Sequence, residues 1–135
     1  MGLVRTKLQI SNPRRSDLQA IEVEALVDTG ALHLCVPEHI ALQLDLEELE
    51  KREVTVADGS KQIVPYVGPI KTTFGNRSCF TGGMVLGEEV LLGAIPMEDM
   101  DLVVRPATRD VAPNPLNPNI PASVAMGARR RFGVD

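Results

Sequence analysis

An alternation of apolar and polar residues that ends directly on a carboxylate constrains the fold of this chain more than any other feature. In residues 21–27 every odd-numbered position is apolar, and Glu22 and Glu24 lie between them. This period of two is typical of a β-strand with one buried face, since successive side chains point to opposite sides. At 25–27 three apolar residues follow one another, and Asp28 comes next. We therefore expect the strand to end buried on both faces, just before the acidic side chain.

A second segment repeats this pattern later in the chain. Residues 25–31 read Ala-Leu-Val-Asp-Thr-Gly-Ala and residues 89–94 read Glu-Val-Leu-Leu-Gly-Ala, so both run from apolar residues into a glycine-alanine step. Each segment also leads to a proline, Pro37 or Pro96, which suits the first position of a helix. The repetition predicts two related halves folded on one another, each with a short helix.

Turn-forming pairs predict two hairpins. Asp58-Gly59 lies between the apolar runs of residues 53–67, and Asp-Gly in this position favours a hairpin because both residues tolerate a positive φ. Pro65 lacks a ladder donor, which places this hairpin at a sheet edge. A second hairpin is expected over residues 70–86, with its turn at Gly75-Asn76. The remaining predicted elements are strands at 3–10, 32–36 and 102–104, a buried apolar segment at 90–94, and helices at 37–46 and 96–100.

Composition limits the classes of function. A chain of 135 residues, 44% of them hydrophobic, suits one compact domain. Fourteen basic and eighteen acidic residues give a net charge of −4, which argues against nucleic-acid binding. No apolar run approaches the ~20 residues that cross a bilayer, and the first residues do not resemble a signal peptide. We therefore expect a cytoplasmic protein that binds neither nucleic acid nor membrane.

The C-terminal part differs in character from the rest. Five prolines fall within residues 106–121, which predicts an extended, proline-rich tail over residues 106–135, either a strap across the surface or a loose linker. Residues 123–126 could add a terminal strand, and the three arginines at 129–131 are expected to be a solvated end.

The cysteines and histidines do not predict a metal site. Cys35 and Cys79 are too few for a disulfide framework, and the sequence has no CxxC or HExxH spacing. His33 and His39 are six residues apart and have no cysteine or carboxylate cluster around them in the sequence. We expect both cysteines to pack as small hydrophobic residues.

Asp28, Thr29 and Gly30 are the best candidates for functional residues. A carboxylate that follows an apolar strand is costly unless backbone donors or a shared proton relieve it. The same triplet also favours a simple turn between two strands. The triplet alone therefore leaves a functional and a structural interpretation open.

The surroundings of the triplet resemble the retropepsin-like aspartic proteases, in particular their short single-domain bacterial members. The segments that carry the resemblance are 25–31, 54–60, 90–94, 101–104 and 113–115. The resemblance implies a mostly β fold: a closed acid-protease barrel with one or two short helices, equivalent to one pepsin lobe, over residues 1–105. It also implies an aspartic endopeptidase, a hydrolase that needs no cofactor or metal and works as a homodimer on an extended peptide or protein substrate.

Roles for single residues follow from the same resemblance. Asp28 of each copy would be catalytic, and the two carboxylates would share one proton and activate a water molecule. The residues that support the catalytic loop would be Thr29, Gly30 and Ala31. The flap that covers the substrate would contain Ala57, Asp58, Gly59 and Ser60. The catalytic loop would be braced from the second half by Leu92 and Gly93.

Two other interpretations stay open. The chain could be a non-catalytic peptide-binding or dimerisation module on the same barrel, with Asp28 kept as a turn residue. It could also be an unrelated β-barrel that binds a small molecule. A fold alone does not imply activity. We favour the peptidase because an intact triplet occurs together with two supporting motifs in the right order.

Overall fold

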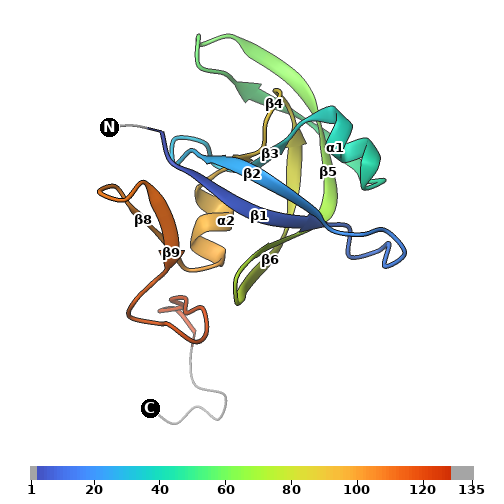
Figure 1. The fold of residues 1–135 in the computed structure, drawn as a ribbon. Helices are drawn as coiled ribbons and strands as arrows, with labels where there is room; N and C mark the ends of the chain where they lie inside the picture. The colour runs from blue at the N-terminus through green and yellow to red at the C-terminus, as the bar shows by residue number, and fades with distance from the viewer. Residues whose placement is uncertain (1–2, 129–135) are drawn as a thin grey trace.

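The strands close into a barrel in the computed structural model, which describes residues 3–128 (Figure 1). The sheet order is β1-β2-β7-β3-β6-β5-β4, and β5 also pairs with β1, which closes the ring and leaves β4 outside it. The strands are β1 (Arg5–Ser11), β2 (Ile21–Val27), β3 (Leu34–Val36), β4 (Glu47–Thr55), β5 (Lys61–Phe74), β6 (Arg77–Val85), β7 (Leu91–Leu92), β8 (Leu102–Arg105) and β9 (Asp110–Pro113). The two short helices are α1 (Glu38–Gln43) and α2 (Ala94–Asp99). The predicted fold class, a mostly β closed barrel with one or two short helices, is confirmed.

Both hairpins and the internal repeat are present. Strands β4 and β5 form the first hairpin, and β5 and β6 form the second, which turns at Gly75-Asn76. The two repeated apolar segments lie side by side, since β2 and β7 pair in parallel with Leu26 opposite Leu91. This pairing brings the end of β2 and the repeated segment β7 together at one point of the barrel.

The helix ends differ from those predicted. Helix α1 stops at Gln43 rather than residue 46, because Asp45 adopts a positive φ of 50° that ends the helical turn. Helix α2 begins at Ala94, so Pro96 occupies its third position instead of its first. A proline fits there because the N–H groups of the first helical turn have no partner within the helix. The end of β2 also differs: Leu26 and Val27 are half-buried and not enclosed on both faces.

A main core fills the barrel, and a smaller buried cluster consists of Cys35, Val64 and Met84. Side chains at alternate positions of the strands point into the main core, and both helices add apolar residues to it. The fully buried side chains include Leu8, Ile10, Leu34, Ile70, Leu92 and Met100. Cys35 and Cys79 are both buried and free, as expected of small hydrophobic residues. Among the described residues, no helix is long and apolar enough to cross a membrane.

The chain beyond residue 105 is folded against the barrel. Strand β9 pairs antiparallel with β8, so the hairpin they form spans the boundary expected at residue 106. The segment that follows β9 lies at the opposite end of the molecule from the β4–β5 hairpin (Figure 1). The strand suggested for residues 123–126 does not form. The arginines at 129–131 lie outside the described residues.

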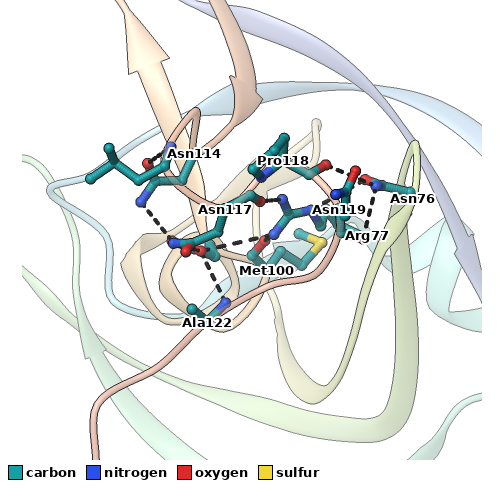
Figure 2. A network of polar contacts seen from close by, with 10 residues as sticks. Asn76, Arg77, Met100, Asn114, Asn117, Pro118, Asn119 and Ala122 are labelled. Carbon is teal, nitrogen blue, oxygen red and sulfur yellow. Dashed lines mark hydrogen bonds and ion pairs between the residues drawn. The ribbon is translucent and has the colours of Figure 1, made fainter.

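A buried arginine ties this C-terminal segment to the barrel (Figure 2). Arg77, at the start of β6, is 1% exposed and donates hydrogen bonds to the carbonyl oxygens of Met100 (3.3 Å) and Asn117. Its guanidinium lies 3.9 Å from the carboxylate of Asp101. That carboxylate accepts three further hydrogen bonds from the C-terminal segment, donated by the side chains of Asn114 (3.1 Å) and Asn117 (2.9 Å) and by the backbone of Ala122 (3.0 Å).

Candidate active site

Backbone hydrogen bonds at the end of β2 place Asp28 at the edge of the barrel. Leu26 donates its N–H to the carbonyl oxygen of Val90 (2.9 Å), and Asp28 donates to that of Leu92 (3.0 Å). On the other side, Val27 donates to the carbonyl oxygen of Val4 (2.8 Å). The position of Asp28 is therefore set by the barrel, and its side chain is left available for chemistry.

The loop after Asp28 is closed by its own hydrogen bonds. One carboxylate oxygen of Asp28, Oδ1, accepts the N–H of Gly30 at 3.0 Å, and the Asp28 carbonyl accepts the N–H of Ala31 at 3.0 Å. The start of α2 then holds the loop from the other side: Ala94 donates to the carbonyl oxygen of Ala31 and Ile95 to that of Leu32, both at 2.9 Å. Asp28 is half-buried, whereas Thr29 and Gly30 are exposed.

Gly93 lets the second half of the chain approach this loop closely. A methyl group at Gly93 would lie 2.3 Å from the carbonyl oxygen of His33 and 2.9 Å from that of Ala31, both of which are backbone atoms. Only a residue without a side chain fits there. At Gly30 the same methyl group would lie 3.2 Å from Oδ1 of Asp28, which is tight but involves a side-chain atom that can move.

Asp28 faces a cleft of about 620 Å³ between the loop and the β4–β5 hairpin. Gly30 and Ala31 also line it from the loop side. From the hairpin side, residues 53–57 contribute, and they include Ala57. The other predicted flap residues, Asp58, Gly59 and Ser60, form the exposed hairpin tip and are not part of the lining. The remainder of the lining is mostly apolar and consists of Leu32, Met84, Leu86 and Leu91 together with His33 and Cys35.

The hairpin tip is a tight turn. Val56 donates to the carbonyl oxygen of Ser60 (3.0 Å), and Gly59 donates to that of Val56 (2.9 Å) with a φ of +85°. The Asp58 carboxylate accepts the N–H of Ser60 at 2.8 Å, and hydrogen bonding from Ser60 lowers the pKa of Asp58. The tip is therefore held by its own backbone.

Three ionisable residues in the cleft lining were not predicted as site residues from the sequence. His33 follows the loop by two residues, Cys35 lies at the centre of β3, and Glu53 lies near the end of β4. Burial, with a smaller contribution from the charge of Asp28, raises the pKa of the Cys35 thiol, which keeps it neutral. The carboxylate of Glu53 is 3.6 Å from the ammonium group of Lys61. The one signal in the sequence that could have indicated these residues was that each lies only a few positions from the triplet or from the hairpin tip.

Within residues 3–128, no group of three or more histidine, cysteine, aspartate or glutamate side chains is arranged to hold a metal ion.

Comparison of the fold with solved structures gives matches among retroviral and retropepsin-like proteases. The solution structure of the Simian foamy virus (mac) protease matches with a TM-score of 0.45 and 18% sequence identity, covering 68% of this chain and 91% of that one. A crystal structure of a retropepsin-like aspartic protease from Rickettsia conorii matches with a TM-score of 0.40 and 16% identity, covering 68% and 78% of the two chains. No protein-family model matches the sequence, and no curated protein matches it.

Proposed function

We propose that this chain is an aspartic endopeptidase whose active site forms between two copies, with Asp28 of each copy facing the other. The observation that carries the proposal is the position of Asp28: a half-buried carboxylate, fixed through its backbone, at the wall of a 620 Å³ cleft beneath a hairpin. Such a group can exchange protons with a bound substrate without disturbing the fold.

The single chain supplies half of what the chemistry requires. Hydrolysis by carboxylates needs one ionised and one protonated group, and two carboxylates held close together adopt these states by sharing a proton. The sequence has one Asp-Thr-Gly triplet. The surface around it is open in the single chain, since Thr29 and Gly30 are exposed and Leu32 is 60% exposed. A two-fold related copy would cover this surface and add the second carboxylate.

The reaction then needs no covalent enzyme intermediate. The ionised Asp28 takes a proton from a bound water, whose oxygen attacks the scissile carbonyl carbon, while the protonated Asp28 donates its proton to the carbonyl oxygen. A tetrahedral diol forms. Collapse of the diol returns a proton to a carboxylate and breaks the C–N bond, and the leaving nitrogen receives a proton from the dyad. The carboxyl and amine products then dissociate, and the dyad again holds one shared proton.

The cleft suits an extended peptide. The β4 strand borders it, and a substrate strand laid along β4 would form backbone hydrogen bonds, while its alternate side chains would enter the apolar lining.

The test is cleavage of a peptide library between pH 4 and 7, followed by mass spectrometry, for the wild-type protein and for Asp28→Asn. We expect cleavage by the wild type and none by Asp28→Asn, with unchanged circular dichroism because the amide has the same shape. Asp110→Asn, a change of an exposed carboxylate in the β8–β9 hairpin, is the matched control and should cleave normally.

The dimer is tested by dilution. Cleavage per mole of protein should rise with protein concentration, and added Asp28→Asn protein should inhibit the wild type by forming mixed dimers. Cleavage that persists in Asp28→Asn would refute the proposed chemistry. Peptide binding by both proteins without any cleavage would identify a non-catalytic binding module instead.

A further inference from the structure

The β4–β5 hairpin leaves the barrel at one residue, Tyr66. From Tyr66 onward β5 is paired with β6, beginning with Tyr66 opposite Met84. Before Tyr66, residues 61–65 of β5 pair with β4 alone. We call residues 51–65 the free arm, since this part of the hairpin pairs with no other strand of the barrel (Figure 1). Near the base of the arm, Val64 is buried and packs with Cys35 and Met84. Tyr66 therefore lies at the hinge of the arm.

Three side chains stack at this hinge: Arg52 and Tyr66 come from the two strands of the hairpin, and His33 comes from the segment after the Asp28 loop. The guanidinium carbon of Arg52, on the free arm, lies 3.8 Å from the centre of the Tyr66 ring. The His33 ring, which also lines the cleft beside the Asp28 loop, meets the Tyr66 ring edge to face, with centroids 5.9 Å apart and an angle of 73°. Gly82 on β6 makes room for the ring, since a methyl group there would lie 2.3 Å from it. The stack thus connects the free arm, the hinge and the segment that follows the catalytic loop.

The charges around His33 make this stack sensitive to protonation. Burial and the positive charge of Arg52 both lower the pKa of His33 below its usual value. Since Arg52 disfavours the protonated form of His33, protonation of His33 must in turn disfavour Arg52 in its place over the ring. The other ionisable groups that line this cleft are Asp28, Cys35 and Glu53. Glu53 is paired with Lys61, and Arg52 itself is paired with Glu50 at 3.0 Å.

We propose that His33, Tyr66 and Arg52 are positioning residues that hold the free arm over the cleft, and that protonation of His33 releases the arm. A cation over an aromatic ring stabilises the closed position of the arm. A second positive charge beside it weakens that contact. The role of the arm in substrate entry rests on the proposed function. The stack and its response to pH do not, because both can be measured without any substrate.

The composition of the chain allows a direct measurement. Tyr66 is the only tyrosine, tryptophan is absent, and there are two histidines. Tyr66 fluorescence should therefore change with pH, together with the ring-proton resonance of His33, at a midpoint below the usual pKa of a histidine side chain. The change should disappear in His33→Gln and persist in His39→Gln, the matched control on the exposed side of α1. Arg52→Gln should raise the pH at the midpoint of the His33 titration, whereas Lys51→Gln on the same strand should leave this midpoint unchanged.

Movement of the arm is read from amide hydrogen exchange at pH 7. Arg52→Gln should lower the protection of the arm amides about fivefold, the effect of losing one partly desolvated cation–π contact. Lys51→Gln should retain the wild-type protection. In a protein that cleaves peptides, Arg52→Gln should raise KM more than it lowers kcat.

Equal protection of the arm in Arg52→Gln and Lys51→Gln, or a His33 midpoint that does not respond to Arg52→Gln, would overturn the inference. Neither result depends on cleavage. A protein that cleaves no peptide but shows both effects would refute the proposed function and leave the hinge intact.

Discussion

Two arginine–aspartate pairs in this chain allow a sharp prediction about what stabilises the fold. In the Arg105–Asp110 pair the closest atoms are 2.6 Å apart, but the side chains are 56% and 41% exposed. In the Arg77–Asp101 pair the closest atoms are 3.9 Å apart, and the exposures are 0% and 15%. Distance alone would rank the first pair as the stronger one. Burial ranks them in the opposite order, because water screens exposed charges and competes for their hydrogen bonds.

The perturbation is Arg77→Met, which keeps most of the aliphatic length and removes every donor. The change leaves the carbonyl oxygens of Met100 and Asn117 without their buried partner, and it removes the cation from Asp101. Breaking a buried charged pair costs about 3–5 kcal/mol. For a domain with a total stability of about 5–15 kcal/mol, this is a large fraction. The control, Arg105→Met, should change the unfolding free energy little, because water screens this exposed pair.

The measurement is urea unfolding followed by far-ultraviolet circular dichroism, with all proteins at one concentration because a dimer would make the apparent stability depend on it. We expect a much lower midpoint for Arg77→Met and little change for Arg105→Met. An equal or smaller loss of unfolding free energy in Arg77→Met would refute the reasoning, since it would mean that burial does not decide between the two pairs.

Three further predictions follow from single contacts. Gly93→Ala should lower the unfolding free energy by about 2–3 kcal/mol in thermal unfolding, because the added methyl group meets two backbone oxygens, whereas Gly127→Ala, in open space, should change little. Cys35 and Cys79 should resist a thiol reagent at pH 8 until the chain unfolds, since burial raises the pKa of Cys79 to about 11 and raises that of Cys35 as well; rapid labelling of the native protein would contradict this. The pKa of Asp101 is lowered by hydrogen bonds, chiefly from the backbone of Ala122, so its contribution to stability is present above the pKa of the unfolded state and is lost as pH falls through the lower, folded pKa. Urea unfolding across this acidic range should therefore depend less steeply on pH in Asp101→Asn than in the wild type.

Local sequence signals predicted the parts of the fold that depend on neighbouring residues. The Asp-Gly and Gly-Asn pairs gave the two hairpins, because a turn is decided by the φ angles that its own residues tolerate. The alternation before Asp28 predicted the strand but not the environment of its end, which is half-buried and not enclosed on both faces. The repeated segment predicted two related halves and did not indicate that β2 and β7 pair. Helix ends were less accurate, since Pro96 suits either the first or the third position of a helix.

Contacts between distant residues could not be predicted in this way. Arg77 follows a turn at the start of a strand, a position that suits an exposed charge, and nothing near it in the sequence indicates burial. Its partners at Met100 and Asn117 are 23 and 40 residues away. The contact of His33 with Tyr66 is of the same kind, because His33 lies outside the predicted hairpin to which Arg52 and Tyr66 belong. The proline-rich composition after residue 106 indicated an extended chain but not the side chains that hold it.

The two ends of the molecule are stabilised by different kinds of contact, and this bears on what the candidate active site can tolerate. At the C-terminal end, side chains such as Arg77 and Asp101 make the contacts that hold the segment. At the Asp28 loop, backbone groups make nearly all of them: Asp28 donates to Leu92, and Ala94 donates to Ala31. A loop held by its backbone can change its side chains at little cost in folding, provided that Gly93 keeps its place. The chain therefore presents a carboxylate at a fixed position, while the stability of the fold is supplied elsewhere.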